Sequence, residues 1–447
     1  MGKSKPEVNQ EGTVTMTYRR AERAGVPWLL AALLLAAAAD VRPADGVAGP
    51  EPAPKPTPTP ATTQDPAAKT QDKPRLDIYG FAMLDMGYEA GQTDPNWFDV
   101  LRPTKLPAFE DQYGEDGHFF AGVRQSRLGV KGFMPTDVGE VKTIFEFELF
   151  GTGVDAGQTT FRLRHAWGEL GQIGAGQTWS PFMDIDVFPN SVEYWGPNGM
   201  VFFRNVQLRW TPWSNEQGSR FVVALERPGA SADQGEYAGR IELQDVKARF
   251  PLPDLSAHYR HVAGWGHVQV AGILRQIKWD DLNDDQFDLS GDATGWGINV
   301  STNVKVGKHV IRASVVYGDG IQNYMNDAPV DVGIQNNFSD PRKPIVGKAL
   351  PMLGLSAFID LNWTSEWTST AGYSMLDIDN TDGQTPDAFK KGQYALANIL
   401  YHPAPNVMLG PEIQWGKREN ARDGFTSDDF RIQFSAKYNF NLSLGGK

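Results

Sequence analysis

FRIQFSAKYNF (Phe430 to Phe440) alternates strictly between apolar and polar side chains. A period of two residues belongs to a β-strand, whose successive side chains point to opposite faces. The apolar face is rich in aromatic rings and the segment lies close to the end of the chain, as the closing strand of a transmembrane barrel does. Such a barrel must pair its last strand with its first, because an open sheet edge is not tolerated in lipid. The candidate first strand is 76–88.

Composition excludes several classes of protein. The 447 residues include no Cys, so disulfides, thiolate nucleophiles and Cys metal sites are absent. The formal charge of −12 argues against a nucleic-acid partner. Beyond the N-terminal region, no apolar run approaches the roughly 20 residues that a spanning helix needs. Barrel strands need only about 10 alternating residues each, so a mean hydropathy of −0.40 is compatible with an integral barrel.

The N-terminal region has the pattern of a secretory signal. Arg19, Arg20 and Arg23 precede the apolar run 28–39, which ends in small residues. Because this run is short for a membrane span, we expect residues 1–39 to be a signal peptide, with an N-terminal anchor as the less favoured alternative.

Residues 40–74 are predicted to be a Pro-rich linker in the periplasm. The segment 51–60, EPAPKPTPTP, favours an extended polyproline conformation. A simple tether is the favoured interpretation, and a spacer reaching toward the cell wall is the alternative.

Sixteen segments of the remaining chain have strand-like patterns. They are 76–88, 121–133, 139–150, 159–170, 173–179, 202–210, 219–227, 254–262, 266–278, 294–304, 309–318, 354–362, 367–378, 391–402, 407–417 and 429–440. Long connections such as 89–120, 180–201 and 319–353 follow odd-numbered strands, and tight turns follow even-numbered ones. Outer-membrane barrels sort their connections in this way, whereas a sandwich would not. The predicted fold is therefore all-β, a 16-stranded antiparallel transmembrane β-barrel over residues 75–447.

Aromatic residues gather near the ends of several predicted strands, among them Trp210, Trp363 and Trp367. Amphipathic rings prefer the membrane interface, so these positions are expected to form girdles. Two residues do not fit the alternation: His165 and Pro411 both fall on the predicted lipid face.

The chain also resembles the DcaP-like porins within the general porin superfamily. The matching segments are DIYGFAMLDMGYE (77–89), SRLGVKGF (126–133), FRLRHAWGELGQIGAGQTWSPF (161–182), YALANILYHPAPNVMLGPEIQWGKREN (394–420) and AKYNF (436–440). The resemblance implies a homotrimeric channel in the outer membrane of a Gram-negative bacterium, surrounded by lipid and lipopolysaccharide. It also implies a third long loop folded inward as a constriction, and small anionic solutes such as dicarboxylates as cargo. Two features depart from the family: residues 441–447 extend beyond the terminal aromatic, and the linker replaces an N-terminal coiled coil.

The predicted lumen is basic although the whole chain is acidic. Strand parity points few acids inward, Glu146 and Glu148 among them, and a larger set of bases. Those expected at the constriction are Arg127, Lys131, Arg162, Arg164, Arg209, Arg260 and Arg312. A channel needs a polar lumen and a charged constriction, and a basic one favours anions. In the alternative interpretation these arginines only pair with Glu146, Glu148 and loop acids, and so stiffen the wall.

The third loop, 181–200, carries Asp184, Asp186 and Glu193 among several aromatic residues. If the loop folds inward, its acids face the arginines and set up a transverse field. The alternative is an ordinary surface loop, but so aromatic a segment is not expected to be fully solvated.

No cofactor, metal site or catalytic residue is expected. The loop 281–292 only partly matches a calcium loop, because Gln286 occupies the position that requires Gly. A barrel enzyme such as an outer-membrane lipase would need a Ser–His pair, and His165 has no evident Ser partner. The sequence therefore favours passive diffusion of small hydrophilic solutes, with a structural anchor tethered toward the cell wall as the alternative and a barrel enzyme as the less favoured one.

Overall fold

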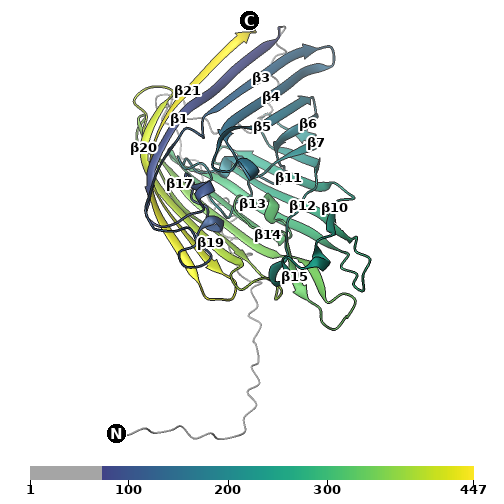
Figure 1. Cartoon of the computed structure of the whole chain (residues 1–447). Helices are drawn as coiled ribbons and strands as arrows, with labels where there is room; N and C mark the ends of the chain where they lie inside the picture. The colour runs from purple at the N-terminus through teal and green to yellow at the C-terminus, as the bar shows by residue number, and fades with distance from the viewer. Residues whose placement is uncertain (1–72, 447) are drawn as a thin grey trace, which may run out of the picture. The chain divides into compact units, whose positions relative to one another are not determined.

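The computed structural model describes residues 73–446, and these form an antiparallel β-barrel (Figure 1). The predicted signal peptide (1–39) and nearly all of the predicted linker (40–74) lie outside the described residues. None of the helices in the described part is long and apolar enough to cross a membrane.

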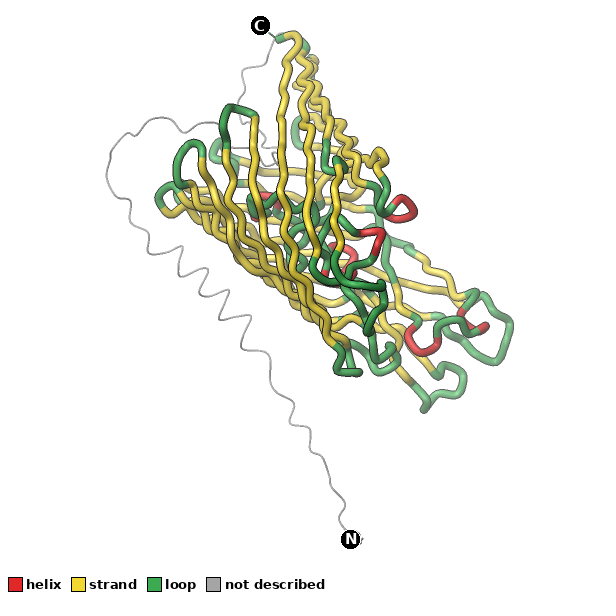
Figure 2. Tube along the Cα trace, turned by 60° about the vertical axis from the view of Figure 1, so that its left-hand side comes forward, coloured by secondary structure: helices red, strands yellow, loops and turns green. Residues whose placement is uncertain are grey.

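Eighteen strands share one sheet, and sixteen of them close the barrel. The sixteen are β1 (Arg75–Glu89), β3 (Arg127–Thr136), β4 (Gly139–Phe150), β5 (Thr159–Leu170), β6 (Ile173–Trp179), β7 (Arg204–Ser214), β8 (Arg220–Glu226), β11 (Asp254–Ala263), β12 (Gly266–Asp281), β13 (Gly291–Val306), β14 (His309–Asp319), β17 (Pro351–Asn362), β18 (Trp367–Ile378), β19 (Phe389–Tyr401), β20 (Val407–Asn420) and β21 (Thr426–Gly445). The other two are short and extend neighbours: β2 (His118–Gly122) pairs with β1, and β10 (Val246–Arg249) pairs with β12. Figure 2 shows short turns at one end of the strands and the longer connections at the other.

The barrel closes through β1 and β21, as the alternation of 430–440 predicts. Their antiparallel register runs from Arg75 opposite Gly445 to Glu89 opposite Arg431. The segment that contains Tyr79 therefore joins the segment that contains Tyr438. Strand β21 continues beyond Phe440 to Gly445. The residues after the terminal aromatic therefore lengthen the pairing between β1 and β21.

The two faces of β21 show which side meets lipid. Phe430 and Ile432 are 49% and 47% exposed, whereas Gln433 and Ser435 are fully buried. A water-soluble sheet buries its apolar face, and here the polar face is buried instead. Apolar residues outside and polar residues inside are what a membrane barrel requires.

The structure differs from the prediction in one strand, 121–133, and in the orientation of one side chain, that of His165. Segment 121–133 is interrupted between β2 and β3, where the Ser126 hydroxyl accepts a hydrogen bond from the Met83 amide at 3.0 Å. On β5 a bulge inserts one residue, because Glu146 pairs with His165 while Phe147 pairs with Leu163.

That bulge corrects the prediction that His165 faces lipid. Arg164 and His165 are adjacent, yet both are buried. The Nδ1 atom of His165 lies 3.0 Å from the Thr178 hydroxyl of β6. One extra residue reverses the alternation, so His165 joins the interior face.

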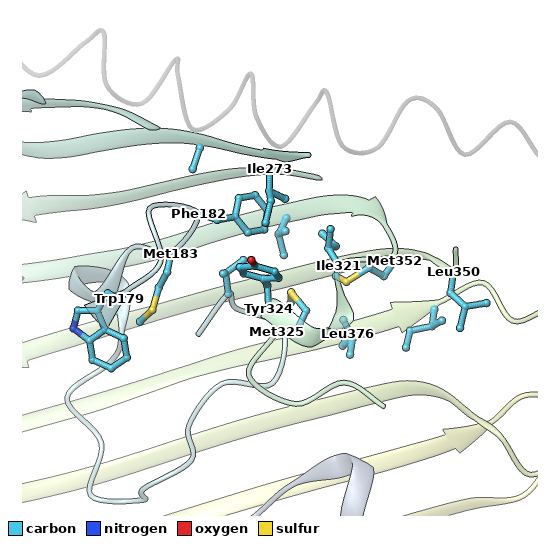
Figure 3. Close-up of a cluster of buried hydrophobic side chains, with 14 of the residues drawn as sticks. Trp179, Phe182, Met183, Ile273, Ile321, Tyr324, Met325, Leu350, Met352 and Leu376 are labelled. Atoms are coloured by element: carbon cyan, nitrogen blue, oxygen red, sulfur yellow. The ribbon is translucent and has the colours of Figure 1, made fainter. Parts of the chain in front are cut away.

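The long connections pack against the buried faces of the strands through a shared apolar cluster. In Figure 3, Phe182 and Met183 of the β6–β7 connection lie with Tyr324 and Met325 of the β14–β17 connection, beside Ile273 of β12. The β14–β17 connection also carries β15 (Val332–Asn336) and β16 (Ile345–Ala349). These two strands form a small separate sheet with β9 (Ala232–Asp233), which periodicity did not predict.

Candidate functional site

The β6–β7 connection, residues 180–203, is the predicted third loop, and its first part is fixed to three strands. The Asp184 carboxylate accepts from Arg260 Nη1 at 3.1 Å and from the Ser301 hydroxyl at 2.7 Å, and its Oδ2 lies 2.7 Å from His267 Nε2. These partners belong to β11, β13 and β12. Burial alone would raise the pKa of Asp184, but His267 and Arg260 outweigh burial and hold this pKa well below its ordinary value.

Asp186 lies beside the same network. Its carboxylate pairs with Arg260, and its backbone carbonyl accepts from Arg312. Arg312 also pairs with Asp360 of β17, with 2.6 Å between Nε and Oδ2. Asp184 and Asp186, two of the three predicted loop acids, thus each contact the Arg260 guanidinium group.

Asp184, Asp186 and His267 also offer ligand atoms that all lie within 4.8 Å of one another. A divalent cation could use such a set. Arg260 already compensates both carboxylates, however, so a cation would have to displace the guanidinium group.

The middle of the connection is fixed to another part of the barrel. Glu412 of β20 accepts hydrogen bonds from the backbone amides of Val192 at 2.9 Å and Glu193 at 3.2 Å. The Asn398 side chain of β19 donates to the Asn190 carbonyl at 2.8 Å, and Gln433 of β21 donates to the Val192 carbonyl at 3.3 Å.

Glu193 makes a different set of contacts from the other two loop acids. Its carboxylate accepts from the amides of Leu101 at 3.2 Å, Trp195 at 3.0 Å and Gly196 at 2.5 Å, and from the Tyr394 hydroxyl at 3.3 Å. Burial raises the pKa of Glu193 to about 7. Glu193 therefore shapes the loop and makes no ion pair within residues 73–446.

Four arginines surround two glutamates on the wall that faces this connection. Arg164 Nε and Nη1 lie 2.6 Å from Glu146 and 2.5 Å from Glu148. The Arg127 guanidinium lies 3.3 Å from Glu148, and those of Arg162 and Arg204 each lie 3.7 Å from it. Tyr194 of the connection donates to Glu148 as well. We call the four arginines with Glu146 and Glu148 the arginine cluster.

The structure groups some predicted site residues and separates others. Arg127, Arg162 and Arg164 lie together in the arginine cluster, whereas Arg260 and Arg312 lie with the loop acids. Lys131 lies beside Tyr79, its Nζ 4.9 Å from the ring centroid. Arg209 donates to Gln207 and to the Trp179 carbonyl.

Sequence reasoning missed three arginines. Arg204 has the outward parity of β7, yet it begins the strand where the connection covers it. Arg220 shares the inward parity of Val222 and Glu226, so alternation could have found it. Arg102, in the β1–β2 connection, stacks on Trp195 and pairs with Asp327, a contact between distant loops that gives no periodic signal.

A closed sixteen-stranded barrel with an apolar exterior and a charged polar interior defines an outer-membrane porin. Residues 117–440 match the family model described as DcaP outer membrane protein, which confirms the resemblance found in the sequence. The chain belongs to this family. No curated protein matches it in sequence.

Solved structures share the fold. The outer membrane channel DcaP of Acinetobacter baumannii is 23% identical, with 82% of this chain and 97% of that chain covered and a TM-score of 0.67. An anion-selective porin from Comamonas acidovorans is 11% identical, with 82% and 100% covered and a TM-score of 0.51. OmpT of Vibrio cholerae, solved in a trimer form, is 14% identical, with 82% and 99% covered and a TM-score of 0.50.

Proposed function

We propose that this porin passes small hydrophilic solutes by passive diffusion and prefers anions such as dicarboxylates. The arginine cluster carries the proposal, since four guanidinium groups there face two carboxylates. The surplus positive charge lies on a low-dielectric wall, where it raises the local concentration of anions. Arg204 contributes the fourth of these charges, with its guanidinium 3.7 Å from Glu148.

The β6–β7 connection is proposed to cross the barrel interior and narrow the channel. Contacts with β11, β12 and β13 at one end and with β19, β20 and β21 in the middle support this, because these strands occupy different sectors of the wall. A loop that touched only its neighbours in sequence could not reach them all. Asp184 and Asp186 then lie across the channel from surplus arginine charge, and such an arrangement produces a transverse field.

Part of the arginine set has a structural role instead. Arg164 is almost fully enclosed, with a side chain only 4% exposed, and it holds Glu146 and Glu148 together. Arg162, at 30% exposure, remains accessible to solutes. Wall stiffening and anion attraction are thus assigned to different members of the cluster.

Assembly and targeting follow the same proposal. Residues 1–39 direct export, residues 40–74 tether the barrel in the periplasm, and three copies assemble in a membrane of lipid and lipopolysaccharide. Support for the trimer comes from a structural neighbour, OmpT, which has been solved in a trimer form.

Reconstitution in a planar bilayer under a KCl gradient tests the proposal. Discrete conductance steps with a reversal potential of anion sign are expected. Silent membranes would favour a structural anchor, and a reversal potential of cation sign would reject the anion preference.

A further inference from the structure

A recess lies between the inner face of the barrel wall and the start of the β6–β7 connection. It holds about 700 Å³ of empty space, part of it continuous with solvent. Its lining extends from Gly171 and Gln172 in the short β5–β6 turn to Ser180 and Met183 in the connection. The recess therefore lies toward the short-turn end of the barrel, which in outer-membrane barrels is the periplasmic end.

We propose that this recess is a second anion site, which binds one carboxylate group of a solute between Arg209 and Arg220. The inference rests on the proposed channel function and gives it a defined binding step. Both guanidinium groups line the recess, and both side chains are partly exposed. Within residues 73–446 neither one lies within 4.0 Å of a carboxylate, unlike the paired guanidinium groups of Arg164 and Arg260.

Arg209 is held in position without being neutralised. Its Nε and Nη2 atoms donate to the Gln207 side-chain oxygen at 3.0 and 2.9 Å, and its guanidinium lies 5.0 Å from the Trp167 ring centroid. Neutral acceptors and an aromatic face fix the group and leave its charge available. An arginine oriented in this way loses little conformational freedom when it binds an anion.

Arg220 is oriented by a histidine that must be neutral in this arrangement. The Nδ1 atom of His258 lies 2.8 Å from the Pro181 carbonyl, which can only accept, so Nδ1 carries the proton. The Nε2 atom then accepts from Arg220 Nε at 3.3 Å. His258 thus orients the Arg220 guanidinium group and contributes no charge of its own.

The remaining lining groups also favour an anion. Asp184 is already compensated by Arg260, and Glu169 is the other carboxylate of the lining. The Trp179 ring lines the recess too. Two guanidinium groups without a carboxylate partner therefore outnumber one uncompensated acid. Planar carboxylates match the fork of donors that a guanidinium group presents.

Trp179 also connects the recess to the arginine cluster. Its ring centroid lies 5.4 Å from the Arg164 guanidinium and 4.9 Å from that of Arg204, while its carbonyl accepts from Arg209. An anion that leaves the cluster toward the short turns therefore meets the recess next. Two successive sites of this kind make flux saturable, because an occupied site delays the following solute.

Single-channel recording in the presence of succinate tests the proposal, with neutral succinamide as the matched solute. We expect succinate, and not succinamide, to interrupt the current of the full-length porin. In Arg220→Gln and in Arg209→Gln the interruptions should shorten by roughly tenfold, the usual size for loss of one charged hydrogen-bonding partner. The control Arg240→Gln removes an exposed arginine that pairs with Glu242, and it should leave the interruptions unchanged.

The KCl reversal potential separates this inference from the proposed function. A channel that is anion-selective, but whose succinate interruptions are the same in both variants, overturns the second site alone. A wild-type channel without anion selectivity overturns the proposed function itself. If the Arg220→Gln protein does not insert into the bilayer, Arg220→Lys replaces it, because lysine keeps the charge but lacks the paired N–H donors of a guanidinium group. Unchanged succinate interruptions in Arg220→Lys also overturn the site.

Discussion

Arg164 of β5 donates to both Glu146 and Glu148 of β4, at 2.6 and 2.5 Å, from within the bulge that also turns His165 inward. One guanidinium group thus bridges two carboxylates that lie on the same face of the neighbouring strand. Because all three side chains are almost completely enclosed, this contact holds strands β4 and β5 together within the arginine cluster.

Arg164→Ala is expected to destabilise the barrel. Removing one partner of a buried ion pair leaves uncompensated charge and typically costs about 3–5 kcal/mol. Urea unfolding in lipid vesicles, followed by tryptophan fluorescence, measures the change. Arg162→Ala is the matched control, because Arg162 is more exposed and lies 3.7 Å from Glu148. Equal stability of the two variants would contradict the structural role of Arg164.

Arg162→Ala is expected to change selectivity instead. Its side chain is 30% exposed, so its charge acts on passing ions more than on the wall. The reversal potential under a KCl gradient should move toward cations while the unfolding midpoint stays within experimental error of the wild type. A reversal potential equal to that of the wild type would show that Arg162 does not determine the anion selectivity.

The barrel could be predicted from the sequence because each strand of a membrane barrel carries its own signal. Alternation in 430–440 and in 76–88 was enough to identify the seam between β1 and β21. The bulge at Arg164 and His165 could not be predicted in this way. A single inserted residue leaves a local pattern that still alternates, and only the pairing with β4 reveals the shift.

The candidate site was predictable only in part, for a related physical reason. Inward parity identified Arg127, Arg162 and Arg164, but it carries no information about contacts between loops. Glu193 illustrates the limit. Two of its hydrogen-bond partners, the Leu101 amide and the Tyr394 hydroxyl, lie far from it in the sequence. The neutral role inferred for His258 likewise depends on the Pro181 carbonyl and not on any motif.

Asp184→Asn is expected to loosen the β6–β7 connection. The substitution removes the charge that Arg260 compensates and weakens contacts with three strands. Single-channel conductance should rise and the open-channel current should become noisier. Asp284→Asn serves as the control, since Asp284 is an exposed acid in the β12–β13 connection. Unchanged conductance and noise in Asp184→Asn would mean that this anchor does not set the width of the channel.

Glu193 is expected to make stability depend on pH. Burial raises its pKa from 4.5 to about 7 in the folded protein, so the unfolded chain releases the proton first as pH rises. The resulting stabilisation is complete below pH 4.5 and is lost as pH rises toward 7. At about 1.36 kcal/mol per pKa unit, the change is on the order of 3 kcal/mol. Unfolding of wild type and Glu193→Gln between pH 4 and pH 8 should therefore give curves that diverge in this window, and parallel curves would contradict the raised pKa.

Deleting residues 441–447 is expected to weaken the seam without opening it. Residues 441–445 of β21 pair with 75–79 of β1, whereas the register from Phe440 to Arg431 is untouched. The freed end of β1 stays paired with β3 on its other side, so the ring of strands remains continuous. Each lost backbone hydrogen bond contributes about 1 kcal/mol, and the temperature at which the folded band converts to the unfolded band on a gel should fall. The variant Leu442→Ala keeps the backbone pairs and should convert near the wild-type temperature. If the truncated chain gives no folded band at all, the residues after Phe440 are required to close the barrel. The remaining β1–β21 pairs, from Phe440 to Arg431, would then not be sufficient.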